Sequence, residues 1–322
     1  MEVFYLTLSQ MITMFILILS GYALRKYHIL PEESHLTLSR LETYILVPAL
    51  NIVNWSKNCN PESLSENAVL ILYGLGVIIL ALLIAYPLAA LFVRNAKTPA
   101  EKYQRNIYKY AMTFGNYGFM GNFIVLGIWG DEMFFKYSMF TLFISFVCSS
   151  WGLIILIPKE SGTRVSFKNM VRSIFTPPVV ALFIGMIIGV LNLGAYVPSF
   201  VNTALSNAGN CMGPVAMILA GFVIGGFNLK SLIINKKVYI ATVFRLILIP
   251  ALFVLLLKLI GANDTVLTLT LICLATPFGM NTIVYPAAYG GDFRTGASMT
   301  MISSTLSVIT IPLMYLIFIV LM

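Results

Sequence analysis

The stretch LICLATPFGMNTIVYPAAYGGD at 271–292 decides how this chain folds. Its hydropathy is that of a membrane span, but Pro277 and Gly279 interrupt the helix beside two polar residues, Asn281 and Thr282. A proline removes one backbone donor and clashes with the carbonyl four residues earlier. Backbone groups freed at membrane depth are tolerated only where protein or water surrounds them. The stretch therefore predicts a broken helix whose freed dipoles lie beside an amide and a hydroxyl that can bind a hydrophilic solute.

A second interrupted span lies in the first half of the chain, IYKYAMTFGNYGFMGNFIVLGIWGD at 107–131. Its centre is loosened by glycines with asparagines among them: Gly115, Gly118, Gly121, Asn116 and Asn122. A shift of 161 positions places Gly118 on Gly279 and Asn116 on Pro277. Two interrupted spans at corresponding places predict the binding site of a secondary transporter. The structural alternative is that the glycines only permit close helix packing.

Composition excludes a soluble protein. The chain of 322 residues is 59% hydrophobic and only 10% charged, whereas a soluble protein carries about 25% charged residues. The net charge of +8 lies in short loops between spans, so no nucleic-acid partner is expected. The four cysteines match neither a metal site nor a disulfide framework. We expect an integral membrane protein with the lipid bilayer as its partner and with no metal and no cofactor.

Windows of ~20 apolar residues predict ten spans. They cover about 4–24, 36–55, 67–93, 107–129, 133–157, 174–193, 199–227, 237–260, 265–289 and 298–321. Most of the basic residues follow odd-numbered spans, so the positive-inside rule predicts that both termini lie outside the cytoplasm. The Ile-, Lys- and Asn-rich composition favours a bacterial cytoplasmic (inner) membrane.

The two halves repeat beyond the broken spans. Gly21, Pro31 and Pro48 in the first half parallel Gly189, Pro198 and Pro214 in the second. A repeat of five spans is odd, so its second copy enters the membrane in the opposite direction. The predicted fold is all-α, with two inverted five-helix repeats at 1–157 and 174–322 joined by a cytoplasmic linker at 158–173.

These motifs resemble the auxin efflux carrier family. The resemblance rests on LVPALNI at 46–52, FGNYGFMG at 114–121, ATPFGMNTIVYPAAYGGD at 275–292 and ASMTMISSTLSVITIPL at 297–313. It implies an elevator-type carrier in which spans 1, 2, 6 and 7 form a scaffold, often a homodimer, and spans 3–5 and 8–10 form the moving transport domain. Broken spans four and nine would cross at the centre of that domain.

The resemblance carries over to individual positions, with two departures. Asn116 matches the family's asparagine before the crossover in span four, and Pro277 matches the proline that opens the break in span nine. Family members often have a proline where this chain has Phe123, and some have one at Thr282. The crossover of this chain would rest on glycines, Asn122 and Pro286 instead.

The sequence nominates a substrate site for a small organic anion such as a carboxylate, because asparagine amides and helix N-termini favour anions. The candidates are Asn116, Gly118, Gly121, Asn122, Pro277, Gly279, Asn281, Thr282 and Arg245. The asparagines have the alternative role of bonding the broken backbone. Arg245, inside span eight, is either an attractant for the anion or a structural anchor.

The other polar residues of the spans are expected to have structural roles, with functional roles as the alternative. Glu42, near the start of span two, is expected to pair at the interface rather than relay protons, with Arg40 two positions away. Span ten carries a serine and threonine stripe from Ser298 to Thr310, and span five a weaker one at Thr141, Ser145, Ser149 and Ser150. Such residues usually bond backbone carbonyls, and lining a solute path is the alternative.

Two other functional classes make different demands on the sequence. An intramembrane enzyme needs a nucleophile with a base, or metal ligands, at mid-membrane, and both histidines lie in one loop. We therefore expect no enzyme. A channel or a membrane-embedded sensory module is the alternative to a carrier.

Overall fold

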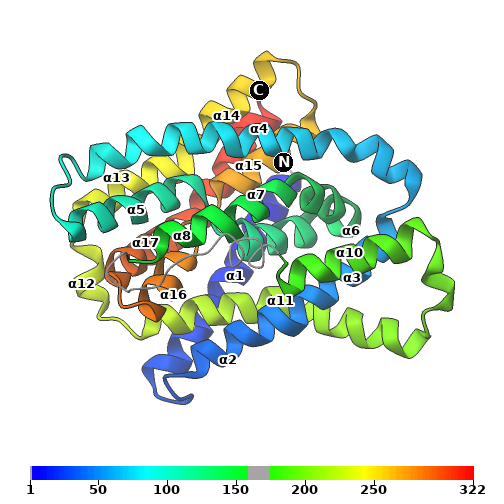
Figure 1. Ribbon diagram of the computed structural model, residues 1–322, viewed down its shortest axis with the longest axis horizontal. Helices are drawn as coiled ribbons and strands as arrows, with labels where there is room; N and C mark the ends of the chain where they lie inside the picture. The colour runs from blue at the N-terminus through cyan, green and yellow to red at the C-terminus, as the bar shows by residue number, and fades with distance from the viewer. Residues whose placement is uncertain (1, 159–174) are drawn as a thin grey trace.

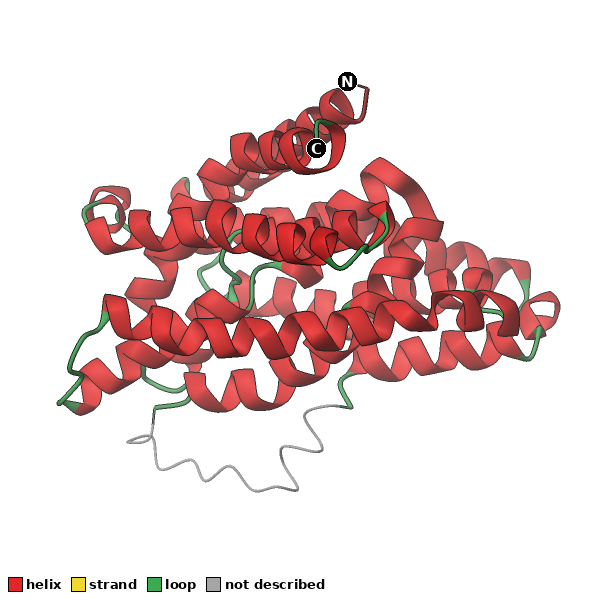
Figure 2. Ribbon diagram, turned by 90° about the horizontal axis from the view of Figure 1, so that it is seen from above, coloured by secondary structure: helices red, strands yellow, loops and turns green. Residues whose placement is uncertain are grey.

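The computed structural model describes residues 2–158 and 175–322, and it is helical throughout that part of the chain (Figures 1 and 2). No strand is found within these two ranges, where the single β-type pairing is an isolated bridge between Gly115 and Phe278. The expected linker at 158–173, apart from Pro158, lies outside the described residues, and so does the first residue of the second predicted repeat.

The helices follow the chain with short connections. Those of the first half are α1 (Glu2–Lys26), α2 (Ser34–Leu41), η1 (Glu42–Leu46), α3 (Val47–Asn58), α4 (Pro61–Phe92), α5 (Pro99–Thr113), η2 (Tyr117–Gly121), α6 (Asn122–Phe140), α7 (Leu142–Val147), η3 (Cys148–Gly152) and α8 (Leu153–Leu156). Those of the second half are α10 (Pro177–Val190), η5 (Leu193–Tyr196), α11 (Ser199–Gly225), α12 (Leu229–Ile233), α13 (Lys236–Val243), η6 (Phe244–Leu248), α14 (Ile249–Leu259), α15 (Asp264–Ala275), α16 (Asn281–Ala288), α17 (Phe293–Tyr315) and η7 (Leu316–Val320).

Within the described ranges, six continuous helices are long and apolar enough to cross a membrane. They are Phe4–Lys26, Ser34–Asn58, Pro61–Phe92, Ser199–Gly225, Lys236–Leu259 and Phe293–Val320. The pair Tyr117–Phe140 and Leu142–Leu156, bent by 52°, adds a seventh if it counts as one span. The protein is therefore an integral membrane protein. The remaining predicted spans are shorter or interrupted helices. α10, for example, has 14 residues, whereas a helix that crosses the hydrocarbon core needs ~20 residues.

Helices from the two halves of the chain pack directly on each other. α1 lies along α11, and α3 lies along α10 (Figure 1). A Cβ atom at Gly21 would lie 1.9 Å from the Ile218 carbonyl oxygen, and one at Gly221 would lie 1.8 Å from the Ile18 carbonyl oxygen. The contact is reciprocal, so each helix needs its glycine for the other's backbone to approach. Gly221 opens the stretch GFVIG at 221–225, whose GxxxG spacing allows close helix contact. That contact is made inside the chain, with α1, rather than left free for a second copy.

Two prolines explain where wide, π-helical turns interrupt the long helices. Pro48 follows η1 and Pro250 follows η6, and neither can donate to the carbonyl four residues earlier. The ladder widens to satisfy that carbonyl, and such π-turns are often found at functional sites. Each of these two turns buries one ionisable residue, Glu42 in η1 and Arg245 in η6.

The start of α5 is fixed by local capping. Thr98 accepts from the N–H of Glu101, and the Glu101 carboxylate accepts from the N–H groups of Thr98 and Lys97. These backbone bonds favour the ionised form and hold the pKa of Glu101 below its ordinary value. The cap therefore fixes the start of the helix at Pro99, and α5, which is 15 residues long, ends at Thr113, next to the break.

Candidate functional site

The two interrupted stretches meet at their breaks. α5 ends at Thr113 and α15 ends at Ala275, and the chain is extended at Phe114 and Thr276, the first residue after each helix. The Asn116 N–H donates to the Pro277 carbonyl at 2.7 Å, beside the antiparallel bridge of Gly115 and Phe278. The freed backbone groups of one break therefore satisfy those of the other, as burial at membrane depth requires.

Glycine makes this close approach feasible. A Cβ atom at Gly115 would lie 2.2 Å from Arg245 Nη2 and 2.9 Å from the Thr276 carbonyl oxygen. A Cβ atom at Gly279 would lie 3.1 Å from the Gly115 carbonyl oxygen. Gly118, in contrast, has open space where its Cβ would be. Gly115 is therefore the position at which the crossing backbone leaves no room for a side chain.

Arg245 holds the C-terminal ends of the two half-helices together. Its side chain is 1% exposed, and its guanidinium donates to the carbonyls of Met112 (3.2 Å) and Thr113 (3.3 Å) at the end of α5. It also donates to the carbonyls of Thr276 (3.2 Å) and Cys273 (3.4 Å) at the end of α15. A cation is favoured there, because helix C-termini present unpaired carbonyls with partial negative charge.

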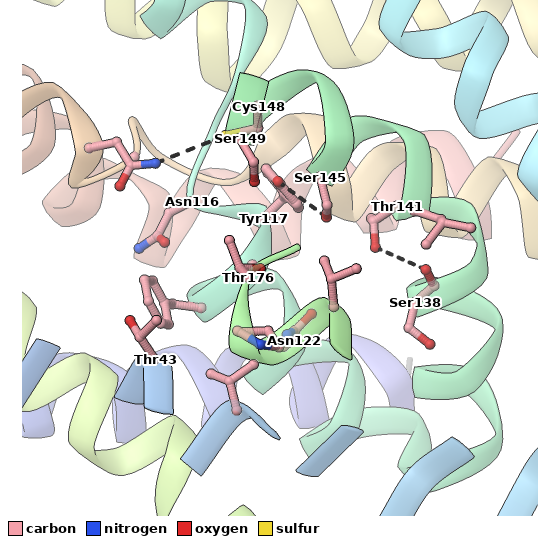
Figure 3. Close-up of a pocket in the computed structure, with 18 of the residues that line it drawn as sticks. Thr43, Asn116, Tyr117, Asn122, Ser138, Thr141, Ser145, Cys148, Ser149 and Thr176 are labelled. Atoms are coloured by element: carbon pink, nitrogen blue, oxygen red, sulfur yellow. Dashed lines mark hydrogen bonds between the residues drawn. The ribbon is translucent and has the colours of Figure 1, made fainter. Parts of the chain in front are cut away.

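A cavity of about 260 Å³ lies beside the crossover, on the side of the helix N-termini. η1, α3 and α10 form one wall of it, and η2, α6, α7, η3 and α16 form most of the other. Its described lining contains no Asp, Glu, Lys, Arg or His. Figure 3 shows Asn116, Tyr117 and Asn122 around this space with Ser145 and Ser149. The site is polar through amides, hydroxyls and backbone groups rather than through charged side chains.

The N-terminal ends of the second half-helices face this cavity. Gly118 and Phe119 of η2 line it, as do Gly279, Met280 and Asn281 at the start of α16. The first N–H groups of a helix have no acceptor within that helix. For Met280 and Asn281, no acceptor is found among the described residues either. These N–H groups can therefore donate to a bound solute.

One asparagine of the site is held by a tyrosine. Asn281 Nδ2 donates to the Tyr110 hydroxyl at 2.8 Å, and that hydroxyl lies 3.2 Å from Cys148 Sγ. Tyr110 is buried, while Asn281 remains half-buried against the cavity. The side chains of Asn116 and Asn122 have no hydrogen-bond partner among the described residues. They are therefore available to a solute.

The predicted site residues divide into two groups. Those that line the cavity are Asn116, Gly118, Asn122, Gly279 and Asn281. Those behind its wall are Gly121, Pro277, Thr282 and Arg245. Thr282 is fully buried and donates to the Gly279 carbonyl at 2.8 Å. A Cβ atom at Gly121 would lie 2.2 Å from the Tyr137 hydroxyl oxygen, which bonds the Tyr117 carbonyl.

The two polar stripes have different surroundings. Thr141, Ser145 and Ser149 of the stripe predicted for span five line the cavity. In α17, Ser303 donates to the Met299 carbonyl and accepts from the Phe278 N–H at 3.0 Å, so it supports the break after α15. Tyr110, Tyr117, Cys148 and Asn51 also line the cavity and were not predicted from the sequence. In the sequence, their residue types alone do not distinguish them from residues that only pack between helices.

One pairing prediction is wrong within the described part of the chain. Glu42 is 0% exposed, and neither carboxylate oxygen has a hydrogen-bond partner there. Arg40, the expected partner, is exposed instead. The widened turn of η1 directs Glu42 inward between helices while Arg40 remains on α2.

A polytopic helical membrane protein with two broken helices around a polar cavity is the class that the fold and the site define. The sequence pattern of the membrane transport protein family matches residues 6–315. The chain therefore belongs to that family, the auxin efflux carrier family. It is 27% identical to an uncharacterized transporter of Methanocaldococcus jannaschii over 300 residues, which are 92% of this chain and 94% of the relative. It is 23% identical to an uncharacterized transporter of Methanothermobacter thermautotrophicus over 303 residues, 94% of this chain and 95% of the relative.

Proposed function

We propose that this membrane transport protein is a secondary carrier that moves a small organic anion, such as a carboxylate, by alternating access. The observation that carries the proposal is that the N-terminal ends of η2 and α16 converge on one cavity without charged side chains. Helix N-termini present free N–H groups and partial positive charge, which favour a carboxylate. The amides of Asn116 and Asn281 add donors on the same surface.

The electrostatic balance favours an anion over a cation. Arg245 satisfies the negative C-terminal ends of α5 and α15, and its guanidinium lies directly behind Gly115. No Asp or Glu is found in the described lining, so a cationic solute lacks a countercharge. The volume of about 260 Å³ is below the roughly 300–1,000 Å³ of pockets for drug-sized ligands. A small acid fits these constraints.

Our proposal includes ten spans in two inverted repeats. In this arrangement α5 and the part of α6 before Gly130, where the backbone leaves the helical conformation, count as one span broken at the crossover. α15 with α16 counts as the other broken span. The scaffold comprises α1, α2 with α3, α10 and α11, and the remaining helices form the transport domain. The packing of α1 on α11 and of α3 on α10 supports this division. So does the cavity, since Asn51 and Leu182 of the scaffold line it together with Asn116 of the transport domain.

Further elements of the proposal concern the cell. We place both termini outside the cytoplasm of a bacterial cytoplasmic (inner) membrane, and we assign a homodimer to the scaffold. The two termini lie near one another in Figures 1 and 2, which supports an even number of spans.

Counterflow in proteoliposomes tests the carrier. Vesicles loaded with unlabelled acetate, succinate or citrate are diluted into the labelled acid, with choline as the cationic comparison. We expect transient accumulation of at least one acid. Asn116→Ala should reduce it, and Asn202→Ala, which changes an exposed asparagine of α11, should not. Accumulation of choline alone would contradict the proposal that the solute is an anion. Acid flux without counterflow would indicate a channel.

A further inference from the structure

Glu42 is a buried acid that the proposed binding site does not use. Its side chain is 0% exposed, and both carboxylate oxygens lack a hydrogen-bond donor among the described residues. Moving an isolated carboxylate out of water costs far more than burying the neutral acid. An ionisable residue within a span is a functional hypothesis by default. The surroundings of Glu42 therefore decide which form of the acid the fold accepts.

The helices packed most closely against η1 are α2, α3, α10 and α11. The titratable or charged side chains of η1 and these helices, Glu42 apart, are His35, Arg40, Tyr44, Lys57 and Cys211. None of them pairs with Glu42: Lys57 bonds Asp131 at 2.6 Å, His35 bonds the Glu32 carbonyl, and Arg40, Tyr44 and Cys211 are exposed. α10 carries no titratable residue. These helices therefore provide no countercharge, and the neutral, protonated acid is the form that suits this position.

The position of Glu42 connects it to the cavity. The next residue, Thr43, lines the cavity, and so do Val47 and Asn51, one and two turns further along the same helical segment. Glu42 itself lies one residue away from that line, in the π-helical turn that precedes Pro48. A change in the packing between scaffold and transport domain at the cavity therefore acts on the turn that encloses Glu42.

We propose that Glu42 is a proton-binding site that couples transport to protons. One carboxylate oxygen takes a proton from water, holds it as an O–H bond while the helices enclose it, and returns it to water when the transport domain moves. The step consumes and releases one proton and needs no other reactant. The coupling part rests on the proposed alternating access, whereas protonation of Glu42 stands on its burial and its lack of partners.

Infrared spectroscopy of the full-length protein in lipid tests protonation without knowledge of the solute. At neutral pH we expect a carboxylic-acid C=O band in the wild type, absent in Glu42→Gln and retained in Glu62→Gln, which changes an exposed glutamate of α4. Absence of that band in the wild type would overturn the proposal, because Glu42 would then be ionised. Persistence of the full band in Glu42→Gln would also overturn it, because the band would then come from another carboxyl group.

Deuterium exchange of the same band tests coupling. The band shifts in D₂O once water reaches the carboxyl, so its exchange rate reports opening. A disulfide between Gln10→Cys in α1 and Gly127→Cys in α6, where the amide end of the Gln10 side chain reaches Gly127, should lock the scaffold to the transport domain. The exposed Cys211 is first changed to serine. We expect the lock to slow exchange at least about tenfold.

The outcomes separate the two proposals. An unchanged exchange rate in a locked protein whose acid counterflow has stopped would overturn coupling through Glu42 and leave the carrier intact. Counterflow that continues in the locked protein would instead contradict the alternating access on which the coupling rests.

Discussion

The backbone N–H of Asn116 donates to the carbonyl of Pro277 at 2.7 Å, and these are the two residues that correspond when one half of the chain is shifted by 161 positions onto the other. Each break thus satisfies the other's backbone. The C-terminal half-helix ends point to Arg245, while the N-terminal ends point to a cavity of about 260 Å³. This separation of negative and positive helix ends is the physical basis of the anion selectivity that we propose.

Gly115→Ala should destabilise the crossover. The new Cβ would lie 2.2 Å from Arg245 Nη2 and 2.9 Å from the Thr276 carbonyl oxygen, and overpacking of this kind costs about 1–3 kcal/mol. Gly118→Ala is the matched control, because its Cβ meets open space. Thermal unfolding of the purified protein should show a lower Tm for Gly115→Ala alone. Equal Tm values for the two variants would show that the crossing is looser than described.

Arg245→Met should be more damaging than Arg245→Lys. The methionine leaves the carbonyls at the ends of α5 and α15 without a donor, at about 1–3 kcal/mol for each buried acceptor left unsatisfied. Lysine keeps the charge but loses the planar fork that reaches both helices. Tm values compared with those of Arg40→Met, at an exposed position, check this order. A stable Arg245→Met protein would rule out the anchoring role.

Two buried tyrosines should respond differently to loss of their hydroxyl groups. Tyr110→Phe removes the acceptor of Asn281 and should cost about 1 kcal/mol. Tyr108→Phe removes a buried hydroxyl without a partner among the described residues, so its free energy of unfolding should stay the same or rise. Chemical unfolding of both variants measures the difference. A reversed order would mean that the Tyr110–Asn281 bond contributes nothing to stability.

The Gln10→Cys, Gly127→Cys disulfide should stop transport without abolishing binding. Gln10 of α1 also donates to the Phe123 carbonyl of α6 at 3.2 Å, so this contact must break if the transport domain slides along the scaffold. We expect acid counterflow to disappear on oxidation and to return on reduction. The thermal shift produced by the acid should persist in both states. Full counterflow in the oxidised protein would exclude motion between α1 and α6.

The sequence predicts those features of the site that depend on local chemistry. Proline and glycine locate both helix breaks, and the shift between the halves pairs Asn116 with Pro277 before any contact is known. Tyr110 and Cys148 could not be identified, because they approach Asn281 only through packing between distant helices. The role of Arg245 was undetermined for the same reason. The prediction for Glu42 failed because Pro48 widens the helix at that turn, which sequence periodicity does not show.

The most direct test of the central claim is the thermal stability of the purified protein with small organic acids, measured in parallel for Asn281→Ala and for the exposed-site variant Asn202→Ala. An acid present at 100 times its Kd should stabilise the folded wild type by about 2.7 kcal/mol. Our account predicts a rise in Tm with at least one acid, retained in Asn202→Ala and lost in Asn281→Ala. A rise that persists in Asn281→Ala, or a cooperative transition that no acid shifts, would contradict an anion site at the crossover.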